Sequence, residues 1–328
     1  MCHYMIRRFL FMIIILLAIS IIAFIIIQLP PGDYLTSYMS RLRRQGTSVD
    51  MSEIASLEKF FDLDQPIYIQ YFKWTGAMLQ GNFGYSLGWK CPVNQLIRER
   101  LPLTVMISLF TLIFAYAVAI PIGIYSATHQ YSAGDYTFTV FGFAGLAIPN
   151  FLLALILLWI FYSYFGISVT GLFSPQYRSA SWSIGRFVDL LKHLPIPIIV
   201  IGTAGTAGLI RVMRGCLLDE LQKQYVITAR AKGVSERALL FKYPVRVAVN
   251  PIISTIGWIL PAIVAGGTIT EIVLNLPTIG PIFLLSLMTQ DMYLAGSIVM
   301  LLSFLTVIGT FISDILLVWI DPRIRYGE

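Results

Sequence analysis

The sequence predicts an all-α polytopic membrane protein. Of its 328 residues 57% are hydrophobic and only 12% are charged, whereas a soluble domain carries about 25% charged residues. Long uncharged runs recur along the chain, each close to the roughly 20 residues that a helix needs to cross the hydrocarbon of a bilayer. The net charge of +6 does not indicate nucleic-acid binding, because the Lys and Arg residues are dispersed between these runs, where they usually set membrane topology.

Six of the runs are predicted to be transmembrane helices: residues 9–32, 101–128, 136–165, 193–210, 247–270 and 292–313. The first is longer than the roughly 7–15 apolar residues of a signal peptide and ends in QLPPGD, without a small-residue cleavage site. A seventh run, residues 272–290, is broken by Pro277, Gly280 and Pro281, so we expect a re-entrant or surface segment there.

Basic residues predict the orientation of these spans. Six spans place both termini on one side, together with the eight Lys and Arg residues of the loop 211–246, whereas residues 272–291 contain no Lys or Arg. By the positive-inside rule this side is cytoplasmic, and a first loop longer than about 60 residues crosses regardless of its charge. The chain is therefore predicted to comprise a cytoplasmic N-terminus with the first span (1–32), an external loop (33–100) and a five-helix core (101–328).

The first loop is predicted to be folded. Ser52 and Glu53 are suited to begin a helix in which Ile54, Leu57, Phe60 and Phe61 recur at helical spacing. After a break at Pro66, residues 67–79 are predicted to form a second amphipathic helix. Two interpretations stand side by side: a cap packed on the protein's own spans, or a docking surface for an external partner.

The sequence predicts neither a catalytic nor a metal site. The three histidines and three cysteines lack the spacing of a metal pair, a C-x-x-C motif or a disulfide framework; they are His3, His129, His193, Cys2, Cys91 and Cys216. The chain also has no G-x-S-x-G and no phosphate-binding G-x-x-x-x-G-K-[ST] loop. If the protein moves a solute against its concentration gradient with energy from a nucleotide, another subunit must hydrolyse that nucleotide.

A polar insert, YVITARAKGVSERALLFKYPVRV, interrupts the apolar runs at residues 225–247. It predicts two short helices that meet at Gly233, where glycine accepts the left-handed conformation. Ser235 is expected to cap the second helix, with Glu236 in its first turn, and the helix must end by Tyr243, which precedes a proline. Such an insert suits a helix-in-groove contact; a solvated loop or a helix lying on the lipid surface is the alternative.

Several motifs, taken in order, resemble those of one family. The segment TARAKG resembles the cytoplasmic loop of ABC-importer permeases, and nearly the whole chain resembles the oligopeptide/dipeptide (nickel) permease family, in particular the subunit type with a long first external loop. The segments that carry the resemblance are LDQP (63–66), GNFGYS (81–86), PVNQLIRERLPLT (92–104), YVITARAKG (225–233), LPTIG (276–280) and DPRIRY (321–326). Two positions depart from the pattern: Ile227 replaces an acidic residue common in other ABC importers, and Tyr243 replaces a frequent histidine.

The resemblance implies a non-catalytic permease subunit of a binding-protein-dependent importer in a bacterial or archaeal inner membrane. It implies a second homologous permease, two ATPase subunits and an extracytoplasmic solute-binding protein as partners. ATP and Mg would be held by the ATPases and no cofactor by this chain. The insert would be the coupling helix that contacts an ATPase, through Ala229, Arg230, Lys232, Gly233 and Glu236. Short peptides, oligosaccharides and metal chelates are all substrates of such families.

A pathway hypothesis comes from the outer end of the fifth span. Glu271 follows Gly266, Gly267 and Thr268 there, and an acidic residue at membrane depth indicates function by default. We expect Thr268, Glu271 and Asn275 to line the outer mouth of the translocation path; an interfacial anchor is the alternative. An ion-coupled secondary carrier and a membrane scaffold are the rival functions.

Overall fold

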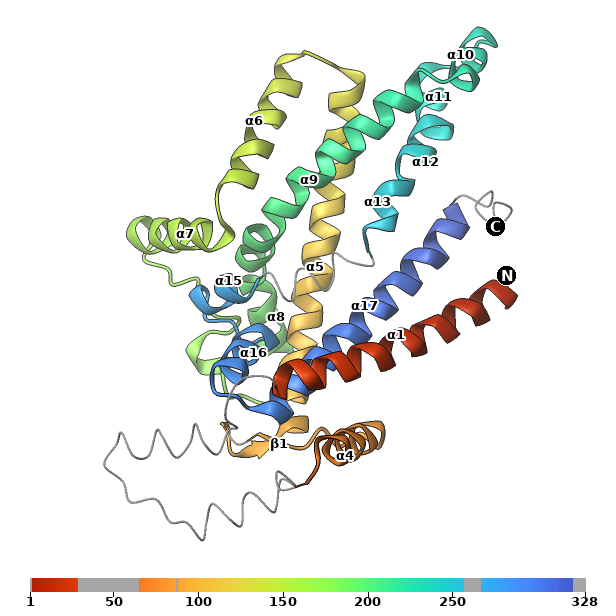
Figure 1. Cartoon of the computed structure of the whole chain (residues 1–328). Coiled ribbons are helices and arrows are strands. Elements are labelled where there is room, and N and C mark those ends of the chain that lie inside the picture. Colours follow the sequence, from red (N-terminus) through yellow and green to blue (C-terminus); the bar gives the residue numbers. More distant parts are fainter. Residues whose placement is uncertain (1, 29–64, 87, 257–266, 321–328) are drawn as a thin grey trace. The chain divides into compact units, whose positions relative to one another are not determined.

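The computed structural model describes residues 2–28, 65–86, 88–256 and 267–320. Figure 1 shows the helices and strands that these residues form. They divide into two compact units. The first unit falls within Met1–Leu103 and Thr278–Val307, and the second within Thr104–Pro277 and Ile308–Glu328. The predicted division at residues 32 and 100 concerns membrane topology and stays a prediction.

In the first unit, α1 (Cys2–Gln28) packs against α4 (Ile67–Leu79). The ring of Phe24 in α1 lies 5.4 Å from that of Tyr71 and 5.6 Å from that of Trp74, measured between centroids. α4 occupies the residues predicted for the second helix of the first loop, so that prediction is confirmed. The helix predicted to begin at Ser52 and Glu53 lies outside the described residues.

The rest of the first unit is a small hairpin on a helical core. Strands β1 (Tyr85–Ser86) and β2 (Cys91–Pro92) pair antiparallel, and α5 (Val93–Thr128) follows directly. The first turns of α5 pack with α16 (Ile279–Met288) and α17 (Met292–Ile320) around one cluster of buried aliphatic side chains. This cluster consists of Val93, Leu96, Ile97, Ile279, Ile282, Leu294 and Ile298.

In the second unit, α6 (Ala133–Ala147) and α7 (Asn150–Phe165) are bent by 102° at a short break. The sequence predicts one span over residues 136–165 and no break within it, whereas the structure divides these residues between two helices. Ile148 precedes a proline and is therefore extended, with φ −86° and ψ 118°. Pro149 then begins α7, so the two helices form a broken span or a re-entrant pair.

A longer helical segment follows. After a short 3-10 turn (Pro175–Tyr177) come α8 (Ile184–His193) and α9 (Pro195–Leu221). The predicted span ended at residue 210, whereas α9 continues for about three further turns. Arg211 and Arg214 end the part of α9 that is apolar enough for the membrane interior. Because arginine is a good helix former, the helix itself continues past them.

The remaining helices are short. The insert contains α10 (Gln224–Ala231) and α11 (Glu236–Lys242), and α12 (Pro244–Ala248), α13 (Asn250–Ser254) and α15 (Thr268–Val273) follow. α9, α12 and α13 pack together with α5 in the main core of the second unit. Its buried residues are Ala115, Ala119, Ala127, Leu209, Met213, Leu217, Val245, Ala248 and Ile252.

Membrane-length helices confirm the all-α polytopic class. Within the described residues, four helical segments are long and apolar enough to cross a membrane, or five if α6 and α7 form one span. The predicted fifth span falls partly on residues 257–266, outside the described part, so the six-span count stays a prediction. Of the breaks predicted within residues 272–290, the one at Pro277 is confirmed, because α15 ends at Val273 and α16 begins only at Ile279. Gly280 and Pro281 lie in the first turn of α16 and do not break it.

Candidate functional site

The polar insert is a two-helix unit that turns at a glycine. Gly233 has φ +79°, so the predicted left-handed hinge is confirmed. Its N–H donates to the carbonyl of Arg230 at 3.0 Å, and the N–H of Val234 donates to the carbonyl of Ala229 at 3.4 Å. These bonds satisfy carbonyls that the end of α10 would otherwise leave unpaired. Apart from its two chain neighbours, a Cβ on Gly233 would meet no atom of the described residues within 4 Å, so the requirement for glycine here is one of backbone conformation.

The second helix of the insert begins and ends where predicted, but its cap differs. Ser235 occupies the N-cap position of α11, yet its hydroxyl accepts no capping hydrogen bond, so this detail of the prediction is wrong. The carboxylate of Glu236 in the first turn points back to α10. Tyr243, with φ −117° and ψ −80°, ends α11 immediately before Pro244, as expected.

An ion pair joins the two helices. The Nε of Arg230 donates to Oε1 of Glu236 at 2.7 Å, and its Nη2 donates to Oε2 at 3.1 Å. Through these bonds Glu236 raises the pKa of Arg230, and Arg230 lowers the pKa of Glu236. Because both side chains are exposed, the pair contributes little to stability. It links the end of α10 to the first turn of α11.

A small apolar core lies beneath this ion pair. Val226, Ala229 and Leu239 are buried against one another, with Val234 and Tyr243 packed beside them. The resemblance names Ala229 as an ATPase contact; its side chain is 8% exposed and lies in the insert's own core. The other predicted contact residue, Lys232, is exposed at the turn.

The residues predicted to line a pathway lie on or just after α15. Glu271 is 2% exposed, Thr268 is half-buried one turn earlier in the helix, and Asn275 is exposed. Asn275 has φ +52°, a conformation that Asn tolerates better than most residues. The carbonyl of Leu274 accepts a hydrogen bond from the N–H of Gly171 at 2.7 Å, which ties this turn to the loop after α7.

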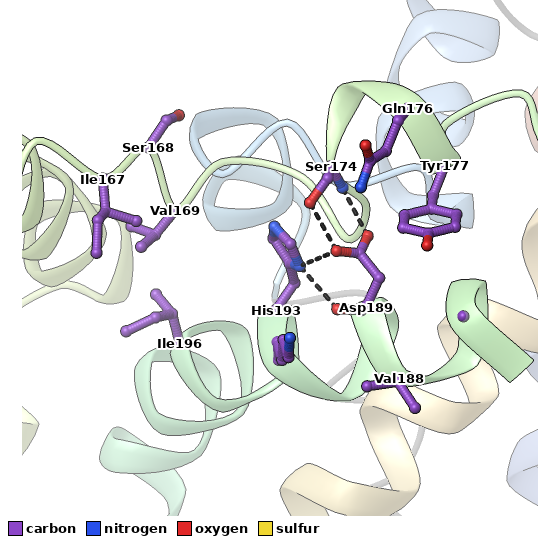
Figure 2. A pocket seen from close by; sticks show the side chains of 12 residues that line it. Ile167, Ser168, Val169, Ser174, Gln176, Tyr177, Val188, Asp189, His193 and Ile196 are labelled. Carbon is purple, nitrogen blue, oxygen red and sulfur yellow. Dashed lines mark hydrogen bonds and ion pairs between the residues drawn. The ribbon is translucent and has the colours of Figure 1, made fainter.

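A cavity lined by the loop after α7, by α8 and by the start of α9 was not predicted. It has a volume of about 780 Å³, and Figure 2 shows Ser174, Asp189 and His193 at its wall. The Asp189 carboxylate accepts from the Ser174 N–H at 2.7 Å and from its hydroxyl at 2.6 Å. His193 Nδ1 lies 2.8 Å from the Asp189 carbonyl. From the sequence, the four-residue spacing of Asp189 and His193 could have indicated that these two side chains meet on one helix face. The contact of Asp189 with Ser174 could not be predicted, because it depends on how the loop folds.

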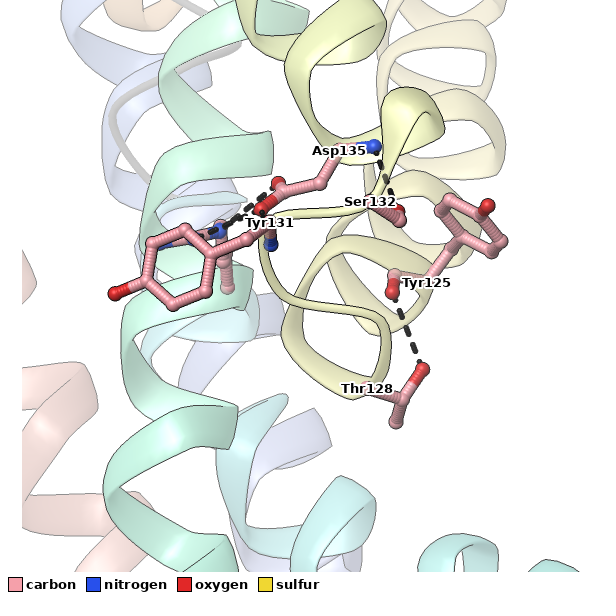
Figure 3. Close-up of polar contacts among 6 residues, drawn as sticks. Tyr125, Thr128, Tyr131, Ser132 and Asp135 are labelled. Atoms are coloured by element: carbon pink, nitrogen blue, oxygen red, sulfur yellow. Dashed lines mark hydrogen bonds and ion pairs between the residues drawn. The ribbon is translucent and has the colours of Figure 1, made fainter.

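A second unpredicted feature is an ion pair between α6 and α9. Asp135 is buried and accepts from Arg214 Nε at 3.2 Å and Nη2 at 3.0 Å. It also accepts from the N–H of Tyr131, and its own N–H donates to the hydroxyl of Ser132, which caps α6 (Figure 3). The partners lie 79 residues apart in the sequence, so no local spacing predicts the pair. Among the described residues, no group of three or more His, Cys, Asp or Glu side chains is placed to hold a metal ion.

Comparison with known proteins gives matches along the whole chain. The family model described as a binding-protein-dependent transport system inner membrane component matches residues 119–326, and the model of the N-terminal part of such membrane components matches residues 1–109. The oligopeptide transport system permease protein AppB of Bacillus subtilis (strain 168) is 37% identical over 99% of this chain and 100% of its own length. The dipeptide transport system permease protein DppB of Alkalihalophilus pseudofirmus is 28% identical over 99% and 100%. The oligopeptide transport system permease protein OppB of Salmonella typhimurium is 28% identical over the same shares.

Proposed function

Because the chain belongs to the family of binding-protein-dependent transport system inner membrane components, we propose that it forms part of the translocation path of an ABC importer for short peptides. As a member of this family it is a non-catalytic, multi-pass permease of the inner membrane that works with ATPase and binding-protein partners. Full-length similarity to oligopeptide and dipeptide permeases is the observation that carries the peptide assignment.

We further propose the composition of the complete transporter. This chain pairs with a second homologous permease, two ATPase subunits bind on the cytoplasmic side, and an extracytoplasmic binding protein delivers the solute. ATP and Mg are held by the ATPases. The charge distribution of the loops supports this orientation, with both termini and the insert in the cytoplasm.

The shape of the insert supports its role as the ATPase contact. It has its own small apolar core and a turn at Gly233 with a left-handed backbone conformation. An ion pair between Arg230 and Glu236 links its two helices. A segment that is already folded loses little conformational entropy when it docks. Closure of the ATPases on binding ATP would move this insert as a body, and α9 and α12, which flank it in the chain, would carry the motion into the membrane.

Uptake by reconstituted transporter tests the function. Proteoliposomes contain the permease, its partner subunits and a labelled short peptide with the binding protein outside. We expect uptake only with ATP inside, and none when the ATPase carries an inactivating substitution. Uptake driven by an ion gradient without ATP would instead identify a secondary carrier, and no uptake of any solute would fit a scaffold. Parallel assays with oligosaccharides and a nickel chelate separate the substrate classes.

A further inference from the structure

A groove between α6 and α9 combines aromatic and basic residues. It has a volume of about 340 Å³, and its lining comes from both helices and from the turn that precedes α6. The aromatic and apolar part includes Phe138, Phe143 and Leu146, and the basic part consists of Arg211 and Arg214. Neither the predicted coupling residues nor the predicted pathway residues contribute to it.

The two arginines of this groove differ in their electrostatic state. Arg214 is paired with the buried carboxylate of Asp135, so its charge is compensated. The guanidinium of Arg211 lies 5.1 Å from the ring centroid of Phe143, and within the described residues it has no carboxylate partner. Arg211 thus provides an exposed, uncompensated positive charge at the edge of an apolar groove. An arginine is well suited to bind a phosphate through two parallel hydrogen bonds.

Tyr131 is held at the mouth of the same groove in an unusual conformation. Its φ is +60°, which is rare for a bulky residue, and its N–H donates to the Asp135 carboxylate at 3.1 Å (Figure 3). Its side chain is 75% exposed. The carboxylate that compensates Arg214 therefore also holds the backbone of Tyr131, a residue of the groove's lining. Residues held in strained conformations concentrate at functional sites.

The apolar surface continues from the groove along α6. Tyr136, Val140, Phe141 and Phe143 are between 55% and 72% exposed. A free inorganic anion would gain nothing from this surface, whereas a hydrocarbon chain would. By the predicted topology, the turn before α6 and Arg211 lie at the cytoplasmic edge of the membrane, where aromatic residues and basic pockets meet anionic headgroups.

We propose that this groove binds an anionic phospholipid. The lipid phosphate contacts Arg211, the headgroup lies beside Tyr131, and an acyl chain follows the exposed face of α6. The neutral Asp135–Arg214 pair fixes the groove's geometry and leaves one net positive charge for the ligand. This charge favours an anionic headgroup over a zwitterionic one. The bound lipid would join α6 to α9, the helix that precedes the insert.

Native mass spectrometry of the intact transporter tests the proposal, with phosphatidylglycerol and phosphatidylcholine supplied in separate mixed micelles. We expect the wild type to retain phosphatidylglycerol preferentially. Arg211→Gln should lower this retention about tenfold, the scale of one lost charge-assisted hydrogen bond. Arg211→Lys should retain an intermediate level. Arg178→Gln is the matched control, because it removes another exposed arginine that lies outside both the groove and the insert, and it should leave retention unchanged.

Three results would overturn the proposal. Equal phosphatidylglycerol retention by the wild type and Arg211→Gln would exclude Arg211 as the headgroup contact. Displacement of the lipid by excess inorganic phosphate would show that the acyl chain contributes no binding energy. Cross-linking of a cysteine introduced at Phe141 to the partner permease, with no lipid retained, would make this face a subunit interface. The readout requires no transport, so it stands apart from the uptake assay.

Discussion

Single residues determine the shape of the coupling insert, and Gly233 is the clearest example. Its positive φ turns the chain between α10 and α11, and none of the described residues beyond its two neighbours fills the space around its Cβ position. A side chain at this position therefore has two distinct costs. Backbone strain would cost about 1 kcal/mol, and a clash would arise only where an ATPase subunit covers the turn.

Gly233→Val should leave the permease in the membrane but weaken its contact with the ATPases. We expect less ATPase to co-purify and substrate-stimulated ATP hydrolysis in liposomes to fall. Gly233→Asn is the matched control, because Asn tolerates the left-handed conformation and removes most of the strain. Arg230→Ala should have a milder effect, since it removes the ion pair with Glu236 without adding a bulky side chain. Normal co-purification and hydrolysis with Gly233→Val would show that the insert is not the coupling element.

Glu271 carries a second prediction at the residue scale. Its side chain is 2% exposed on a six-residue helix, α15, which packs against α7. If it borders the pathway, Glu271→Gln should change the uptake rate by several-fold and leave the subunits assembled. Ile269→Val, at an exposed position on the same helix, serves as the control. Unchanged uptake across substrate concentrations would leave Glu271 as an interfacial anchor.

At the scale of elements, the hairpin β1–β2 depends on one buried carboxylate. Asp291 accepts from the Ser86 hydroxyl at 2.5 Å and from the Gly88 N–H at 3.0 Å. Its other oxygen accepts from the N–H of Leu294 at 3.3 Å, in the first turn of α17. The Asp291 side chain therefore caps the first turn of α17 and also holds the loop of the hairpin.

Asp291→Ala should destabilise this part of the protein more than Asp291→Asn. Alanine leaves buried donors without acceptors, at a cost of about 1–3 kcal/mol, whereas asparagine retains one acceptor oxygen. Thermal unfolding in detergent and the rate of protease cleavage in the first loop measure the difference. Identical behaviour of the two variants would mean that the hairpin is held by packing alone.

Elements differed in how far the sequence predicted them. The helix at 67–79 and the insert follow from local signals: a proline at the start, a glycine at the turn and apolar spacing. The bend after Ile148 was not predicted, because the long apolar run over residues 136–165 indicated one span even though it contains Pro149. The Asp135–Arg214 pair and the cavity beside Asp189 depend on chain segments brought together by tertiary folding, which local spacing does not reveal.

For the molecule as a whole, the predicted topology puts Cys91 outside and Cys216 inside. Both thiols are free and half-buried. An impermeant thiol reagent should therefore label Cys91 in intact cells, and Cys216 only after the inner face is opened. Labelling of Cys216 in intact cells would overturn the six-span map.

The pH dependence of this labelling has a defined sign. Burial, with smaller contributions from Glu99 and Asp291, raises the pKa of the Cys91 thiol. The reactive thiolate is thus scarcer at neutral pH than for an ordinary cysteine, and the labelling rate should keep rising to a higher pH than it does for an ordinary cysteine. Glu99→Gln removes a nearby negative charge, so it should lower this pKa and speed labelling at a fixed pH.

The unbroken length of α9 has a mechanical consequence for the transporter. Its 27 residues form a rod of about 40 Å, and the insert follows its end after a short turn. A tilt of about 10° about one end displaces the other by roughly 7 Å over such a length. If an ATPase tilts α9 through the insert by a small angle, the opposite end of the helix moves by a distance comparable to the width of a peptide backbone. The length of α9 therefore amplifies the motion.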